Sequence, residues 1–251
     1  MRETRHQKIL DYLVSHQSAD INELSKFINV SEATIRRDLD FLESTGDLIR
    51  VRGGAMKKHE RIEPFVLPRS LIQAEIKKHI GKAAADLVQD NDTIIVSTGS
   101  TTEAMIPFLS EKVGLTIITN ALNVAYQLTR FENISTIVLG GLLRQSEFDL
   151  IGHITEDALS GLVATKFFRG VKGIHPKQGL TASDVVQVRT DRKMIDTVQD
   201  LIILADHTKF NSMGSIQVGP ISIASVIITD IDAPKDDLEL IRQMGVNVIV
   251  V

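Results

Sequence analysis

The sequence predicts a small helical domain followed by a larger α/β domain with a largely parallel sheet. From residue 74 onward, short β-branched runs alternate with segments of helical periodicity. Runs that are apolar on both faces are typical of parallel strands with helices on both sides. Before residue 59, apolar residues recur at helical spacing in three short segments, whereas residues 59–73 contain two prolines and little periodicity. We therefore expect domains at 1–58 and 74–251 joined by a linker at 59–73.

Composition excludes several classes of function. The 251 residues carry a formal net charge of −4, no cysteine, no tryptophan and only 4% aromatic residues. Disulfides, thiolate metal sites and cysteine nucleophiles are excluded, and stacking on single-stranded nucleic acid is disfavoured. The seven histidines show no clustered ligand spacing, so we expect no metal and no cofactor. No apolar leader or membrane-length run is present, which predicts a cytoplasmic protein without a membrane partner.

Three helices are expected in the first domain. Residues 4–15 form the first, with Ile9 and Leu13 on its inner face. Asp20 and Glu23 have capping-box spacing and open the second, which ends near Asn29. A tight turn leads directly to a third helix, so the second and third helices form a helix-turn-helix.

The third helix, residues 31–42, is the candidate reading helix. Ile35, Leu39 and Leu42 share one face, which leaves the front of the helix exposed. Small, hydroxyl and guanidinium side chains at the front of a helix can meet base edges and phosphates in a major groove. The candidate DNA contacts here are Ser31, Ala33, Thr34, Arg36 and Arg37. The alternative is a solvated helix face with a capped start.

A basic β-hairpin is expected after this helix. Gly46 ends the helix, residues 48–51 form a strand, and Gly53 with Gly54 makes the turn. Such a wing can lie along the phosphates, and glycine lets the backbone approach the duplex. The candidate phosphate contacts are Arg50, Arg52, Gly53 and Lys57. The alternative is a hairpin that only closes the small core.

These residues resemble the N-terminal signature of the DeoR family of bacterial transcriptional regulators. The shared positions are Arg5, Ile9, Leu13, Ser31, Thr34, Ile35, Arg36, Arg37, Asp38, Leu39 and the run 52–55. The resemblance implies a winged helix-turn-helix in which the third helix recognises DNA through Thr34, Arg36 and Arg37. Asp38 borders the apolar side of that helix, so we expect it to orient a neighbouring arginine or to close a structural hydrogen bond instead of touching DNA.

The larger domain is expected to begin with a helix at 75–87. Strands at 93–96, 115–118 and 135–139 then alternate with helices at 102–109, 121–128 and 156–163. Further strand runs follow at 166–174, 201–205, 225–229 and 246–250. This alternation predicts a Rossmann-like, doubly covered sheet.

Ligands of such sheets bind beyond the carboxyl ends of the strands. A glycine- and hydroxyl-rich loop after the first strand is suited to an anion such as phosphate, and other strand ends add polar groups. The candidate effector contacts are Thr98, Gly99, Ser100, Thr101, Thr102, Thr119, Asn120, Gly140, Gly141, Asp206 and Lys209. The alternatives are a capped helix after a tight turn, a capping role for Asn120, a plain turn at Gly140–Gly141, and a Lys209–Asp206 pair.

The same positions resemble the family's C-terminal domain, which is similar to the ribose-5-phosphate isomerase fold. That resemblance implies a sensor of phosphorylated sugars. The chain departs from the family at Ser97 and Asp191, where Asp and Lys are usual, and at Lys172 and His175, where acidic residues are usual. A more basic pocket, with Lys172 as an effector contact, favours a sugar acid phosphate or a bisphosphate.

Three functions fit these patterns. The first is a repressor of carbohydrate genes that acts as a dimer or tetramer on a double-stranded operator and is released by its effector. The second is a sugar-phosphate isomerase with an appended DNA-binding head, although the acids expected of its catalytic site are missing. The third is an architectural DNA-binding protein that responds to no ligand.

Overall fold

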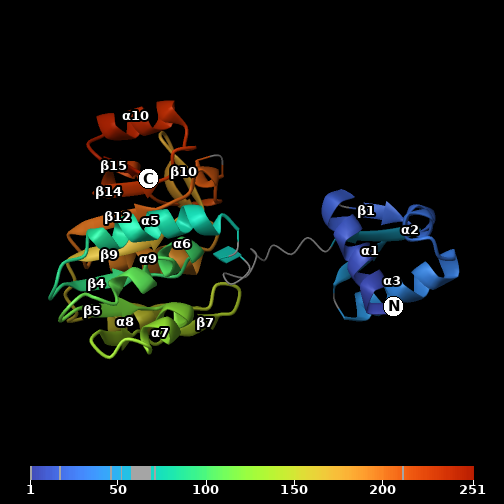
Figure 1. Cartoon of the computed structure of the whole chain (residues 1–251), viewed down its shortest axis with the longest axis horizontal. Helices are drawn as coiled ribbons and strands as arrows, with labels where there is room; N and C mark the ends of the chain where they lie inside the picture. The colour runs from blue at the N-terminus through green and yellow to red at the C-terminus, as the bar shows by residue number, and fades with distance from the viewer. Residues whose placement is uncertain are drawn as a thin grey trace. The chain divides into compact units, whose positions relative to one another are not determined.

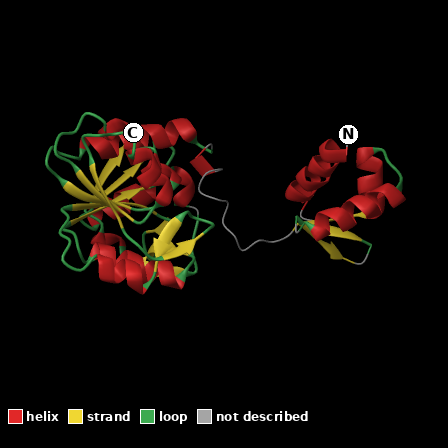
Figure 2. Ribbon diagram, turned by 90° about the horizontal axis from the view of Figure 1, so that it is seen from below, coloured by secondary structure: helices red, strands yellow, loops and turns green. Residues whose placement is uncertain are grey.

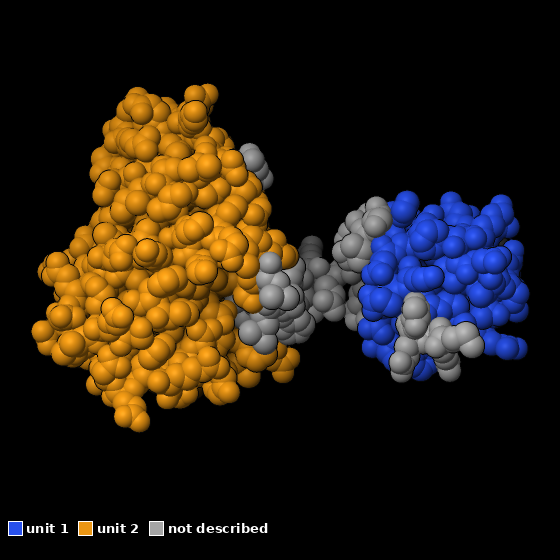
Figure 3. Space-filling model, viewed as in Figure 1, with its two compact units in different colours: residues 1–63 blue, residues 64–251 orange. Residues whose placement is uncertain are grey.

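The chain forms two compact units in a computed structural model that describes residues 2–16, 18–45, 47–51, 53–57, 69–70, 72–210 and 212–251. The units comprise residues 1–63 and 64–251 (Figures 1 and 3). Each has its own buried core. Most of the expected linker lies outside the described residues, so its bounds stay a prediction.

Three helices build the first unit: α1 (Arg2–His16), α2 (Ile21–Ile28) and α3 (Glu32–Ser44). The predicted capping box is confirmed, because Glu23 N donates to Asp20 and Asp20 N donates to Glu23. Asn29 ends α2 in the left-handed conformation at φ 60°, and Ser31 caps α3. The inner faces of the helices bury Ile9, Leu13, Leu24, Ile35, Leu39 and Leu42. The helix-turn-helix is therefore as predicted.

A three-stranded antiparallel sheet completes this unit. The expected hairpin is formed by β2 (Leu48–Val51) and β3 (Gly54–Lys57), and β1 (Ser18–Asp20) pairs with the other edge of β3. The third strand was not predicted, because three residues are too few to show a period. A Cβ on Gly54 would lie 2.2 Å from the carbonyl oxygen of Ala19, so the pairing of β1 with β3 requires glycine there.

Asp38 connects α3 to α1. Its carboxylate is 2% exposed and accepts hydrogen bonds from Arg5 Nε at 2.5 Å and Arg5 Nη2 at 2.8 Å. The ring Nε2 of His6 lies 3.0 Å from the same carboxylate. Burial alone would raise the pKa of Asp38, but the bonds from Arg5 and His6 hold it below its usual value of 3.8. The predicted structural role of Asp38 is confirmed.

The second unit is organised around a seven-stranded sheet in which every neighbouring pair is parallel. The strand order is β15-β14-β12-β9-β4-β5-β6. The strands are β4 (Thr93–Val96), β5 (Thr116–Thr119), β6 (Ser135–Val138), β9 (Lys166–Gly170), β12 (Asp200–Leu204), β14 (Val226–Thr229) and β15 (Asn247–Val250). The parallel α/β class is confirmed.

Helices cover both faces of this sheet (Figure 2). One face packs on α5 (Ala74–Asp86), the 3-10 helix η1 (Ile106–Leu109) and α7 (Leu122–Leu128). The other packs on α9 (Val185–Ile195) and α10 (Lys235–Gln243). The remaining elements are α6 (Ser100–Glu103), α8 (His153–Ala158), η2 (His207–Lys209), η3 (Ile221–Ile223), the hairpin β7 (Leu142–Arg144) with β8 (Asp149–Ile151), and a small antiparallel sheet of β10 (Gly173–His175), β11 (Gly179–Ala182) and β13 (Ile216–Gly219).

Three predicted elements are wrong in their bounds. The helix expected at 102–109 is divided into α6 and η1, because Pro107 in a continuous helix would clash with the carbonyl one turn earlier. The helix expected at 156–163 is α8, which starts after Gly152 and stops before Gly161, both with positive φ. The strand run 166–174 is two strands, β9 and β10, which belong to different sheets.

Among the helices of the described residues, none is long and apolar enough to cross a membrane.

Replacing Asp38 by Asn should destabilise the first unit by roughly 3 kcal/mol, because Arg5 would lose its charged partner in a nearly buried site. Tyr12 lies in this unit and Tyr126 in the other, and the chain has no other tyrosine and no tryptophan. Urea unfolding followed by tyrosine fluorescence in a Tyr126→Phe background therefore reports on the first unit. Asp40→Asn is the matched control, since Asp40 is on α3 but 65% exposed. Equal midpoints for the two variants would contradict the role of Asp38.

The stabilisation by Asp38 should also depend on pH. Its folded pKa is below 3.8, so the stabilisation is complete above that value and is lost as pH falls through the folded pKa. The difference in unfolding midpoint between the parent and Asp38→Asn should be constant at neutral pH and shrink below about pH 4. A difference that stayed constant to about pH 2 would count against the ion pair.

Candidate DNA-binding surface and effector site

The front of α3 presents the residues predicted to meet DNA. Ala33, Arg36 and Arg37 are exposed, and Thr34 is half-buried. Arg36 Nη2 lies 3.0 Å from Glu32 Oε2, one turn earlier, in an exposed pair that is weak enough to be exchanged for a phosphate. Ser31 and Thr34 are hydrogen-bonded to each other at 2.9 Å. Their hydroxyls therefore fix the start of the helix, and the two arginines are the freer groups.

The wing is tied back to the helix. Arg50 Nε lies 3.3 Å from Asp40 Oδ1, and Arg50 Nη1 donates to the carbonyl of Gly54 at 2.9 Å. Its phosphate contact would have to use the remaining N–H groups. Gly53 is exposed with φ +89° and has open space where a Cβ would be. Arg52, the side chain of Lys57 and the stop at Gly46 lie outside the described residues.

The strand order of the second unit defines the position of the effector site. From β4 the chain adds β5 and β6 on one side, and later returns to place β9, β12, β14 and β15 on the other. A crevice forms at the carboxyl edge of a parallel sheet where the strand order reverses, here between β4 and β9. Thr98–Thr102 follow β4, and Lys172 follows β9. A Cβ built on Gly99 would lie 3.9 Å from Gly170 Cα, so the two strand ends are in close contact.

Several predicted hydroxyls in this region are committed to the backbone. Thr102 Oγ1 lies 2.9 Å from the carbonyl oxygen of Ser97 and 2.8 Å from that of Gly99, and its one proton is shared between them. Thr98 Oγ1 donates to the carbonyl of Glu147 at 2.8 Å, and Thr119 Oγ1 to that of Val96 at 2.7 Å. A hydroxyl has a single proton to donate, so these three threonines hold the strand-end loops in shape. Among the hydroxyls of this loop, those of Ser100 and Thr101 are left as direct donors to a ligand, beside the backbone N–H groups.

Asn120 has a different role from the cap considered for it. Ala121 is the N-cap of α7 and makes no side-chain capping bond. Asn120 Nδ2 instead donates to the carbonyl of Leu150 at 2.9 Å, which holds β8 against the end of β5. The Asn120 Oδ1 atom is buried without a hydrogen-bond partner among the residues that the structure describes. It is therefore an available acceptor for a ligand hydroxyl.

The predicted contacts are too widely spread for one small ligand. Asp206 follows β12 and Gly141 follows β6, four strands away, and four spacings of about 4.8 Å amount to roughly 19 Å. A single sugar phosphate is much shorter. A Cβ on Gly141 would lie 2.0 Å from Thr155 Oγ1, so this glycine has a clear packing reason. One small ligand therefore cannot contact both the crevice between β4 and β9 and the Gly140–Gly141 turn.

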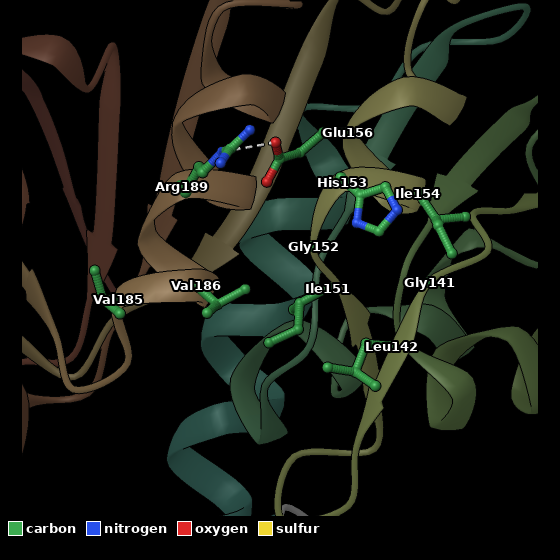
Figure 4. Close-up of a pocket in the computed structure, with 10 residues that line it drawn as sticks. All are labelled: Gly141, Leu142, Ile151, Gly152, His153, Ile154, Glu156, Val185, Val186 and Arg189. Carbon is green, nitrogen blue, oxygen red and sulfur yellow. Dashed lines mark ion pairs between the residues drawn. The ribbon is translucent and has the colours of Figure 1, made fainter.

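Gly141 lines a separate groove of about 660 Å³ (Figure 4). The close-up shows Val185 and Val186 at the start of α9 on one side and Leu142 and Ile154 on the other, with Ile151 between them. Arg189 and Glu156 close one end through an ion pair at 2.9 Å. The walls are mostly apolar, and no other predicted effector residue lines this groove.

Basic residues missed at the sequence level lie near the crevice. Lys77, on α5, is 5% exposed, and burial lowers its pKa, with the charge of Asp206 opposing and those of Lys209 and Arg69 adding to the shift. Lys209 makes no ion pair with Asp206 in the described parts of the chain, and Asp206 instead accepts from Thr208 N at 3.0 Å. A lysine among Ile76, Ile80 and Ala84 on a largely apolar helix face was the signal that could have identified Lys77.

The charge of Asp191 is balanced by an arginine that sequence reasoning overlooked. Arg169 Nη2 lies 2.5 Å from Asp191 Oδ2, and the two side chains are 2% and 6% exposed. The presence of Asp191, where the family usually has lysine, therefore does not make this region more acidic, because Arg169 neutralises its charge. His175 is in β10, where its Nδ1 accepts from Lys177 N and Gln178 N at 3.2 Å and shapes a turn. This histidine therefore gives little support to a more basic pocket.

One histidine does lie in a group with metal-ligand composition. Ligand atoms of His207, Asp230 and Asp232 lie within 4.8 Å of one another. The sequence did not reveal this because the residues follow different strands. Two members already satisfy each other: Asp230 accepts from His207 N and pairs with His207 Nδ1, both at 2.7 Å, and Asp232 joins through its backbone N at 3.3 Å from Asp230 Oδ2. These bonds account for the cluster, and the absence of a metal stays a prediction.

Comparison with known proteins assigns both units. Residues 5–61 match the model of the DeoR-like helix-turn-helix domain, and residues 72–231 match that of the DeoR C terminal sensor domain. The HTH-type transcriptional repressor GlcR of Bacillus subtilis is 33% identical over 99% of this chain and 96% of its own. The glycerol-3-phosphate regulon repressor of Escherichia coli is 30% identical over 96% of each chain. Ribose 5-phosphate isomerase A from Methanocaldococcus jannaschii matches 55% of each chain at a TM-score of 0.42 and 16% identity.

A helix-turn-helix unit joined to an α/β sensor unit defines a ligand-responsive class of transcriptional regulators. The chain belongs to the DeoR family of these regulators. The two relatives above are named as transcriptional repressors, and this chain is a transcriptional regulator of the same family, not an isomerase.

Replacing Arg37 by Ala should weaken specific operator binding by about 1–3 kcal/mol if the guanidinium reads a base, or lower the salt slope by about one if it meets only a phosphate. Fluorescence anisotropy with labelled operator at several salt concentrations separates the two cases. Lys82→Ala removes the same charge from an exposed position of the second unit and is the control. Unchanged affinity and slope in both Arg36→Ala and Arg37→Ala would remove α3 from the recognition surface.

Proposed function

We propose that this protein represses carbohydrate genes by binding a double-stranded operator through α3 and the β2–β3 wing. A phosphorylated sugar or sugar acid, bound at the carboxyl ends of β4 and β9, weakens that binding. One small helix-turn-helix reads a short half-site, so the active form is a homodimer or homotetramer on repeated half-sites. A cytoplasmic location is part of the same proposal.

One observation supports a phosphorylated effector above the others. Lysine side chains lie near the carboxyl edge of the sheet, where the loop Thr98–Thr102 is held in shape by its threonines. The charges of Lys209 and of Asp206, which follows β12 beside β9, both act on the ammonium of Lys77. A phosphate dianion suits this combination, since it accepts charge-assisted hydrogen bonds from ammonium groups and backbone N–H groups. The effector contacts proposed here are Ser100, Thr101, Asn120, Lys172 and Lys209, with Thr98, Gly99, Thr102 and Thr119 shaping the loop.

The relatives support the same class of effector. One is named for the glycerol-3-phosphate regulon, and glycerol 3-phosphate is a small phosphorylated polyol. The unpartnered Oδ1 atom of Asn120 and the hydroxyls of Ser100 and Thr101 suit the hydroxyl groups of such a molecule. Gly140 and Gly141 are proposed to form the packed turn under α8.

The test is operator binding by the purified full chain, with DNA from upstream of its own gene. Anisotropy is measured with and without inorganic phosphate, glycerol 3-phosphate, glucose 6-phosphate and 6-phosphogluconate. Specific binding that one phosphorylated compound weakens supports the proposal. Specific binding that no phosphorylated compound alters favours the architectural alternative instead.

Lys209→Ala should lower the affinity for the active compound by about 10- to 100-fold, because one charge-assisted hydrogen bond contributes about 1.5–3 kcal/mol. Operator affinity without the compound should not change. Lys235→Ala, exposed at the start of α10, is the control for the lost charge. Calorimetric titration measures the affinities directly, and equal values for both variants would place the phosphate elsewhere.

A further inference from the structure

The second unit is entered through a short segment, Arg69–Gln73, whose described residues are held at two points. The boundary between the two units falls within residues 58–68, which lie outside the described residues. Ile72 N donates to the carbonyl of Arg69 at 3.2 Å, and Gln73 adopts φ +57° immediately before α5. Arg69 and Ser70 are helical, and Ile72 and Gln73 form the turn that leads into α5.

The first attachment runs through Glu147. Its carboxylate, 6% exposed, forms an ion pair with Arg69 Nη2. The backbone carbonyl of the same residue accepts the hydroxyl proton of Thr98 at 2.8 Å. Glu147 therefore contacts the segment Arg69–Gln73 with its side chain and the loop after β4 with its backbone. A shift of that loop on ligand binding moves the partner of Arg69.

The second attachment runs through Lys77. Its ammonium donates to the carbonyls of Arg69 and Ile72, each at 2.6 Å. Asp206 and Lys209 are the charged neighbours of this ammonium on the sheet side, and Arg69 is the neighbour on the segment side. A flexible lysine at this position can exchange a carbonyl partner for a phosphate oxygen, which is the stronger acceptor.

We propose that Glu147 and Lys77 are positioning residues that couple occupancy of the strand-end site to the conformation of Arg69–Gln73, and through it to the DNA-binding unit. The inference rests on the effector site proposed above and adds the route by which that site acts. Both attachments converge on Arg69, so a single ligand can change both together. A ligand couples two sites when it binds one conformation of a shared segment more tightly than another.

A purely structural clamp predicts something different. It would make Glu147 and Lys77 important for folding or for ligand affinity, but the ratio of operator affinities with and without ligand would stay the same. That ratio is therefore the quantity to measure. Glu147 is the sharper position, because its side chain pairs with Arg69 and its backbone carbonyl accepts the bond from the loop.

The experiment uses the full chain and whichever of the four compounds named above weakens operator binding by the parent protein. Glu147→Gln should bind that compound within about threefold of the parent, yet the ratio of operator affinities should fall at least fivefold toward one. Arg69→Gln breaks the same ion pair from the other side and should give the same result. Lys77→Met should lower both the compound's affinity and the ratio, whereas Lys77→Arg should restore part of the ratio. Glu111→Gln, an exposed change of the same charge, should match the parent.

A second readout needs no DNA. Trypsin cleavage after Lys57, Lys58 or Arg61 should change in rate when the compound binds the parent, and should not change in Glu147→Gln. Parent-like ratios and cleavage in both Glu147→Gln and Arg69→Gln overturn this inference alone. A parent protein that responds to none of the compounds overturns the proposed effector site, and the inference falls with it.

Discussion

The reversal of strand order between β4 and β9 is the constraint on which the sensor unit depends. Parallel strands all end at one edge, so every loop that follows a strand reaches the same side of the sheet. Only where neighbouring connections diverge to opposite faces is the edge left open, and Thr98–Thr102 and Lys172 follow the two strands that flank this point. The buried residues of β4 and β9, among them Ile95, Phe167 and Phe168, fix those ends in place.

Rigidity at this edge comes from side chains that sequence reasoning had assigned to the ligand. Thr98, Thr102 and Thr119 donate their hydroxyl protons to backbone carbonyls, which removes the flexibility that a free loop would have to lose on binding. A preorganised loop leaves recognition to charge. The buried pair of Arg169 and Asp191 neutralises itself, so the positive charges beside Asp206 are those of Lys77, Lys209 and Arg69.

The fold was largely predictable, because its signals are local. The caps at Asp20, Asn29 and Ser31, and the β-branched runs of the parallel strands, each depend on a few neighbouring residues. The errors arose where a distant contact or one residue overrides the local pattern, as at Pro107 and in the three-residue strand β1. The same limit applies to the site. Residue types suited to an anion were recognisable, whereas the pairing of Arg69 with Glu147, 78 positions apart, depends on the tertiary fold.

The charge balance of the DNA-binding unit favours the proposed use of more than one copy on an operator. Residues 1–63 contain 11 basic and 11 acidic residues, so no general positive field holds this unit on a duplex. Several of the basic groups are already paired: Arg5 with Asp38, Arg36 with Glu32 and Arg50 with Asp40. Affinity from phosphate contacts rises with the number of phosphates neutralised, and one such head neutralises few. In the proposed oligomer, two heads joined through their second units would bind with an effective concentration set by that connection, so the proposed change at Arg69–Gln73 would act on this gain in affinity.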